Sequence, residues 1–140
     1  MSTSRLEERR KGLLRTAVHY AGIAAFCGIF SIVYLQFSYG ESSPFLVWLF
    51  APPLLLGALP ALLLGRYAKR PPVHAARRLW NSAVAALTTG FLVRAVINIS
   101  GRYTDYDGIY WLLAGALFAA AIIFQAVKRG QRRARAAATV

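Results

Sequence analysis

The feature that most constrains this chain is a series of four long apolar stretches, each about as long as a helix that crosses a membrane. They are residues 13–37, 44–65, 79–99 and 109–127. A helix rises about 1.5 Å per residue, so about 20 residues cover the roughly 30 Å of hydrocarbon in a bilayer. Only helices and closed barrels satisfy the backbone there, and these stretches lack the alternation of barrel strands. The sequence therefore predicts an all-α integral membrane protein, a bundle of four transmembrane helices.

The four stretches predict one transmembrane domain over residues 13–128. Residues 1–12 precede it as a short segment, and residues 129–140 follow as a basic tail that we expect to be disordered. Hydrophobic residues make up 57% of the chain, against about 45–50% in ordinary soluble domains. This composition agrees with a chain that is mostly embedded in lipid.

The distribution of charge predicts the orientation. The formal net charge is +12, and the basic residues gather before the first stretch, between the second and third, and after the fourth. The other two connections hold Glu41, Asp105 and Asp107, with Arg102 as their only basic residue. This positive-inside pattern predicts a multi-pass cell-membrane protein with both termini in the cytoplasm. The basic clusters are then expected to meet anionic headgroups, and no nucleic-acid partner is needed to explain them.

Prolines in the second stretch predict a bent helix. Pro52, Pro53 and Pro60 each lack an amide hydrogen and clash with the preceding turn. The carbonyls that lose their usual partners belong to Trp48, Leu49 and Leu56. In lipid these carbonyls need donors from other helices, hydroxyls or water, so we expect the bend to face protein.

Small residues predict close contacts between helices, because backbones approach closely only where side chains are small. We expect the second and third helices to form the interior contact. Rows of small residues occur on the second, third and fourth predicted helices, which is more than one internal interface needs. They therefore predict self-association or docking on a larger membrane complex. The candidate packing residues are Gly57, Ala61, Gly65, Ala86, Gly90, Gly115 and Ala119.

Arg94 is the leading candidate for a functional residue, because a charged side chain inside a transmembrane helix costs about 2.5–3.5 kcal/mol at the centre of the bilayer. It lies five residues before the predicted outer end at Ile99, and an arginine can extend most of that distance toward the interface. One interpretation is therefore structural: Arg94 binds an acidic residue of the outer loops and holds them together. The possible partners are Glu41, Asp105 and Asp107.

The second interpretation is a polar pocket that opens outward. Asn98 lies one turn from Arg94 on the same predicted face, and Thr89 and Ser82 lie deeper. A guanidinium is permanently charged and donates through a rigid fork, so such a pocket would favour an anion or a polar headgroup.

The residues expected of an enzyme are not grouped in this sequence. No carboxylate, histidine and nucleophile converge at one depth, and no carboxylate lies inside an apolar stretch as in proton-coupled pumps. Cys27 is the only cysteine, and His19 is the only histidine within a stretch, so neither a metal set nor a haem pair is expected. The sequence predicts a protein that is not an enzyme and that binds no cofactor.

Three functions follow from these patterns. The leading hypothesis is an accessory or interaction subunit that associates with itself or with other membrane proteins. The second is a small oligomeric channel or facilitator for an anion or polar solute, using Arg94 and Asn98. The third is a phospholipid-handling protein that uses its basic cytoplasmic edge. The abundance of arginine over lysine, together with alanine, is typical of a bacterial source.

Overall fold

The computed structural model describes residues 3–40, 42–67, 72–102 and 105–139, which form helices joined by short connections and contain no strand. Four helical spans are long and apolar enough to cross a membrane: Thr3–Phe37, Pro44–Tyr67, His74–Ile99 and Gly108–Ala138. Each contains one of the four predicted stretches. The all-α class and the four candidate spans are therefore confirmed. The helices are α1 (Thr3–Phe37), α2 (Pro44–Val47), the π-helical segment η1 (Pro52–Ala58), α3 (Leu59–Tyr67), α4 (His74–Ile99) and α5 (Gly108–Ala138).

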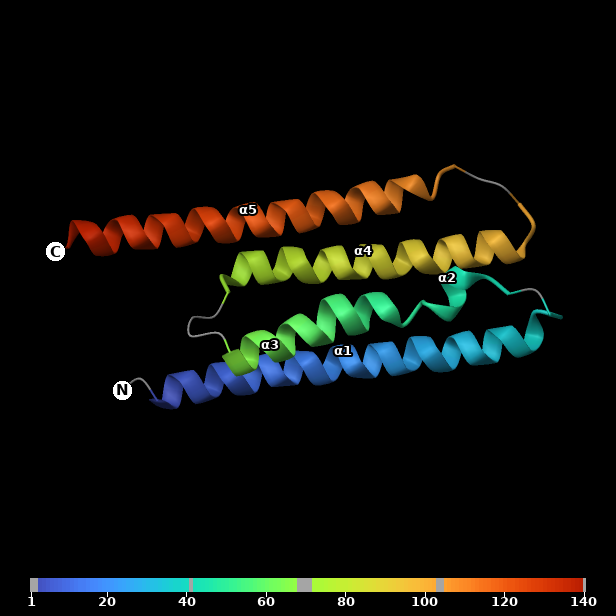
Figure 1. Ribbon diagram of the computed structural model, residues 1–140, viewed down its shortest axis with the longest axis horizontal. Helices are drawn as coiled ribbons and strands as arrows, with labels where there is room; N and C mark the ends of the chain where they lie inside the picture. Colours follow the sequence, from blue (N-terminus) through green and yellow to red (C-terminus); the bar gives the residue numbers. More distant parts are fainter. Residues whose placement is uncertain (1–2, 41, 68–71, 103–104, 140) are drawn as a thin grey trace.

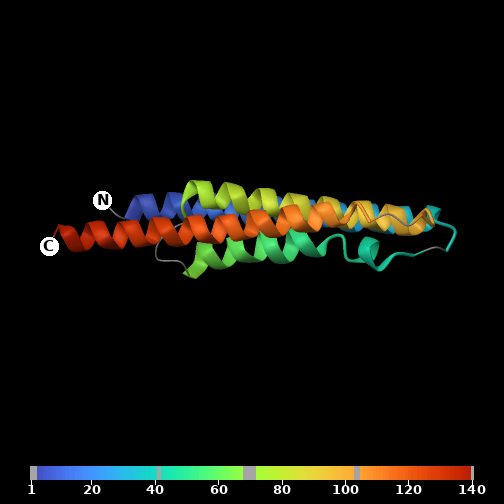
Figure 2. The same ribbon diagram turned by 90° about the horizontal axis from the view of Figure 1, so that it is seen from above.

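The spans lie side by side in chain order (Figure 1). The backbone of α1 packs against α2, η1 and α3, and that of α5 packs against α4 alone. Among the described residues, no Cα atom of α1 lies within 8 Å of one in α4 or α5. Figure 2 shows that α1 and α4 lie toward one side of the molecule and α3 toward the other. The second and third spans do contact one another, as predicted, but α4 packs more extensively against α5, and α1 against the second span.

Both described ends of the chain lie at the same end of the molecule, beside the connection from α3 to α4 (Figure 1). We call this the basic end, because its described residues include Arg15, Arg66, Arg77 and Arg129. The opposite end carries the connections from α1 to α2 and from α4 to α5. We call it the loop end.

The second span is interrupted where its prolines lie. Helix α2 ends at Val47, a turn follows, and η1 begins at Pro52. The amide of Ala51 donates to the carbonyl of Trp48 over 2.9 Å, which gives that carbonyl a partner in place of the amide that Pro52 lacks. A π-helical segment is a known accommodation of an interrupted hydrogen-bond ladder.

A side chain of α4 supplies the partner for a second carbonyl of this span. Pro60 has no amide hydrogen to donate one turn back to Leu56, and the indole Nε1 of Trp80 donates to that carbonyl over 2.6 Å. The Trp80 ring also meets Phe118 of α5 edge to face, with centroids 4.7 Å apart. One residue of α4 therefore links the second span to α5.

Glycines mark the places where helices approach most closely. A Cβ atom at Gly57 would overlap the ring of Tyr20, and one at Gly90 would lie 2.9 Å from the Cβ of Tyr110. Gly57 thus allows α1 to approach η1, and Gly90 allows α5 to approach α4. Gly115 is different, because it is exposed and a Cβ there would meet nothing within 4 Å.

The C-terminal tail differs from the expectation of disorder, because α5 continues to Ala138. It passes through Gly130, which the helix tolerates at a cost of about 1 kcal/mol relative to alanine. The residues beyond Gly130 are rich in alanine and arginine, two of the strongest helix formers. Local propensity therefore extends the helix beyond the apolar stretch.

We expect Trp80→Phe to lower the free energy of unfolding by about 1–3 kcal/mol, because it leaves the Leu56 carbonyl without its donor while keeping an aromatic ring against Phe118. Denaturant titration in detergent micelles, followed by circular dichroism, would measure the change. The Pro60→Ala variant offers a backbone donor to the same carbonyl, so Trp80→Phe should have a smaller effect in that background. Equal effects in both backgrounds would contradict the assignment.

Candidate functional site

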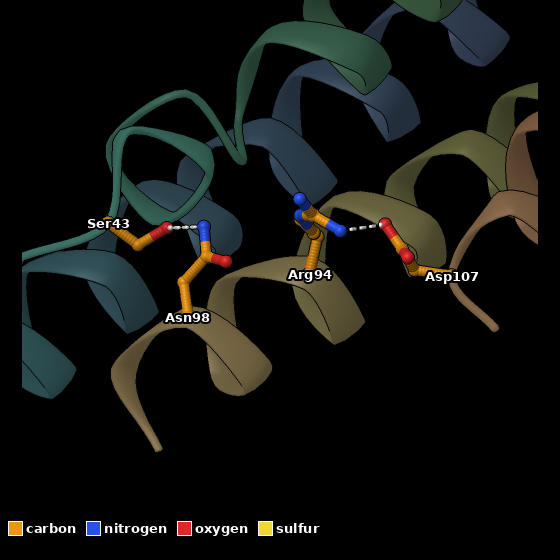
Figure 3. Close-up of polar contacts among 4 residues, drawn as sticks. All are labelled: Ser43, Arg94, Asn98 and Asp107. Carbon is orange, nitrogen blue, oxygen red and sulfur yellow. Dashed lines mark hydrogen bonds and ion pairs between the residues drawn. The ribbon is translucent and has the colours of Figure 1, made fainter. Parts of the chain in front are cut away.

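The residue singled out by its charge, Arg94, forms an ion pair near the loop end. Its Nη1 lies 2.8 Å from Oδ2 of Asp107, as Figure 3 shows. The Asp107 side chain is only 9% exposed and the Arg94 side chain 34%. Asp107 occupies the N-cap position of α5, where the helix dipole also favours a negative charge. Asp107 is thus one of the three partners that the sequence offers to Arg94, and the contact joins α4 to the start of α5.

The second polar contact lies one turn further along α4. The amide Nδ2 of Asn98 donates to the hydroxyl of Ser43 over 3.3 Å (Figure 3). Ser43 is 1% exposed and directly precedes α2. Arg94 and Asn98 do share a region of α4, but they reach in different directions, one to α5 and the other to the start of the second span.

An aromatic group covers this region. Phe45 of α2, Phe91 of α4 and Trp111 of α5 have ring centroids 5.3–6.4 Å apart. The guanidinium of Arg94 lies 5.8 Å from the centroid of the Phe45 ring, a distance at which a cation is attracted to the ring face. The charge of Arg94 is therefore compensated on two sides by the protein itself.

A third polar contact in this half of the molecule is not among those that the sequence predicts. The hydroxyl of Ser31, in α1, lies 2.7 Å from the carbonyl of Leu46 and 2.8 Å from that of Cys27. Ser31 is 4% exposed. It ties α1 to α2, and the signal that could have found it is a lone hydroxyl in an otherwise apolar part of the first stretch.

The other residues of the predicted pocket lie elsewhere. Ser82 and Thr89 are exposed, and the Thr89 hydroxyl donates to the carbonyl of Ala85 in its own helix over 2.9 Å. Asp105 is exposed, and Glu41 lies outside the described residues. The structure therefore does not bring the four residues of that pocket together, since helical position places Ser82 and Thr89 away from the Arg94 contacts.

Two cavities occupy the gaps between helices. One, of about 490 Å³, lies between α1 and α4, and its largely apolar surface includes several polar side chains. His19 borders it and donates from Nδ1 to the carbonyl of Arg15 over 2.7 Å, because that carbonyl can only accept. The polar side chains of this cavity are Thr16, His19, Tyr20, Asn81, Thr88 and Thr89.

The other cavity lies at the basic end, has a volume of about 550 Å³ and is mainly apolar. Residues of α1, η1, α3, α4 and α5 line it, and Arg77 and Arg129 are the charged members of the lining. The sequence does not predict this cavity, because the positive-inside pattern alone explains its two arginines. Neither of the two cavities is lined by Arg94 or Asn98.

The side chains at the loop end and in the two cavities can bind a ligand through hydrogen bonds, charge and apolar contact. Within the described ranges, no group of three histidine, cysteine, aspartate or glutamate side chains is placed to hold a metal ion. No family model, curated protein or solved structure matches the chain. The class that the structure supports is an all-α protein with four helices long and apolar enough to span a membrane.

We expect Arg94→Gln and Asp107→Asn each to lower the free energy of unfolding by about 1–3 kcal/mol, because each leaves a partly desolvated charge unpaired. The double variant should lose less than the sum, with a coupling energy of about 0.5–3 kcal/mol. Denaturant titration in micelles gives all four values. Arg102→Gln is the matched control, an exposed arginine at the same end whose loss should change little. Strictly additive losses for the pair would contradict a direct contact.

Proposed function

We propose that this chain is a multi-pass protein of the cell membrane with both termini in the cytoplasm, and that it serves as an interaction subunit without enzymatic activity. Its partners in this proposal are copies of itself or other membrane proteins, together with anionic lipids on the cytoplasmic side. The charge distribution supports the orientation, since cytoplasmic segments carry the excess of lysine and arginine.

The observation that carries the proposal is the outward face of α5. Of the most apolar 18 residues in α5, 11% are buried within the chain, against 44% in the second span. Gly115 and Ala119 lie one turn apart on α5, and both are exposed. Small residues at this spacing let a second helix pack closely in lipid, where van der Waals contact and not water exclusion drives association.

The geometry favours this proposal over an anion channel. A channel that selects anions through Arg94 needs the guanidinium to be available to the solute. Arg94 is instead paired with Asp107 and lies 5.8 Å from the centroid of the Phe45 ring. The ion pair with Asp107 therefore accounts for a charged residue at position 94, and a role for Arg94 in lining a pore is not needed to explain it.

The orientation gives one prediction. Alkaline phosphatase fused after Gly101, in the connection between α4 and α5, should be active in a bacterial host, because that enzyme folds only after export. The same reporter fused after Val140 should be inactive, whereas green fluorescent protein at Val140 should fluoresce. An active phosphatase at Val140 would contradict the orientation.

The α5 face gives a second prediction. Gly115→Leu should weaken association by about tenfold, equivalent to about 1.4 kcal/mol, because the added side chain separates the two helices. Energy transfer between labelled copies in liposomes measures self-association. Native mass spectrometry after purification in mild detergent detects a different membrane protein that copurifies.

Gly130→Leu is the matched control, since Gly130 lies on the same helix, is exposed and would also have nothing within 4 Å of an added Cβ atom. It lies beyond the predicted apolar stretch, so its replacement should leave association unchanged. A chain that remains monomeric in liposomes and brings down no other protein would overturn the interaction-subunit proposal.

A further inference from the structure

We infer that the apolar cavity at the basic end is a binding site for one anionic phospholipid, with its phosphate at Arg77 and Arg129 and an acyl chain between α3 and α5. This inference rests on the proposed membrane location and deepens the partnership with anionic lipids, but it is independent of association through α5. It rests on the shape of the cavity, its lining and the charge at its rim.

The cavity is open because its two walls do not touch. Helices α3 and α5 have no Cα atoms within 8 Å of each other in the described parts of the chain. The gap beside them has a volume of about 550 Å³ and a mainly apolar lining, which suits an acyl chain. The walls include Ala61 and Leu64 of α3 and Ala121, Ile122 and Ala126 of α5.

The depth of the cavity suits an acyl chain. Arg129 and Ala121 both line it and are eight residues apart on one helix, which corresponds to about 12 Å along the axis. One leaflet contributes about 15 Å of hydrocarbon, half of the total thickness. A lipid whose phosphate lies at the arginines therefore places most of one chain within the apolar walls.

The charge at the rim selects the headgroup. Arg77 lies in the first turn of α4 and donates from Nη2 to the hydroxyl of Thr16 over 2.5 Å. A guanidinium has five donor hydrogens, so this bond leaves others for a ligand. Neither Arg77 nor Arg129 has a carboxylate partner among the described residues, where the one ion pair is Arg94 with Asp107. The lining of the cavity contains no acidic residue.

The entrance is held in place by the protein's own hydrogen bonds. Gln125 of α5 accepts from the backbone amide of Val73, the N-cap residue of α4, over 2.9 Å. Trp80, deeper in the cavity, is fixed to the Leu56 carbonyl. Arg77 and Arg129 thus project from helix segments whose relative position is fixed, which reduces the entropy lost on binding.

The test is native mass spectrometry of the full chain, delipidated and then supplied with phosphatidylglycerol and phosphatidylcholine of identical acyl chains. We expect one phosphatidylglycerol to be retained about tenfold more strongly than phosphatidylcholine, and Arg129→Gln to abolish that preference. Arg77→Gln should do the same, whereas Arg77→Lys, which keeps the charge, should retain most of it. Arg133→Gln is the matched control, one turn beyond the cavity on the same helix.

A second variant tests the apolar walls without changing a charge. Ala126→Trp fills the cavity and should reduce retention of phosphatidylglycerol about tenfold, while Ala136→Trp, exposed further along α5, should not. Equal retention of the two lipids by the unaltered chain would overturn the inference. So would retention that survives both Arg129→Gln and Ala126→Trp, or inorganic phosphate that binds at the arginines with no lipid retained. Association through Gly115 is measured separately and stands or falls on its own.

Discussion

The arrangement of the helices depends on one constraint: the backbone of the second span must be hydrogen-bonded although three prolines remove donors from it. A carbonyl without a partner in hydrocarbon costs several kcal/mol, so the carbonyls that the prolines leave free require other donors. The Ala51 amide of the same span serves Trp48. Trp80 meets this requirement at Leu56 and thereby fixes how α4 lies against the second span. The same indole ring contacts Phe118, which extends the constraint to α5.

Polar contacts link neighbouring spans at both ends of the molecule, but only the basic end combines them with the larger apolar cavity described above. At the loop end, Arg94 is paired with Asp107, Asn98 with Ser43, and Ser31 with the Leu46 carbonyl. These contacts join every span to a neighbour, so this end is closed by the chain itself. At the basic end, Arg77 with Thr16, Val73 with Gln125 and Trp80 with the Leu56 carbonyl also link the spans, and a cavity nevertheless remains beside α3 and α5.

The sequence predicts well whatever depends on segment length and local chemistry. Apolar length alone identifies the four spans, and the prolines identify the interrupted one. The possible partners of Arg94 could be narrowed to three, because few acidic residues lie near the loop end. Faces are harder to predict. In lipid, no exclusion of water forces apolar residues inward, so a stripe of small residues has the same pattern whether it faces a neighbour, like Gly57, or faces outward, like Gly115.

The packing of the spans is hard to predict for the same physical reason. Periodicity says which residues share a face of one helix, but it carries no information about which neighbour approaches which face. The packing is a property of all four helices together, and here no Cα atom of α1 lies within 8 Å of α4 or α5 among the described residues. The cavities result from that arrangement, so no local motif indicates them.

Arginine illustrates how position decides the role of one residue type. Arg94 lies inside an apolar span and has an internal carboxylate and an aromatic ring beside it, as expected where a charge must be compensated by protein. Arg77 and Arg129 lie at the end of the apolar stretches, where headgroup phosphates can compensate them, and the described chain gives neither a carboxylate. In a small membrane protein, headgroup phosphates can therefore compensate arginine charges that have no carboxylate partner in the chain. The cavity that Arg77 and Arg129 line adds an apolar surface beside these two charges.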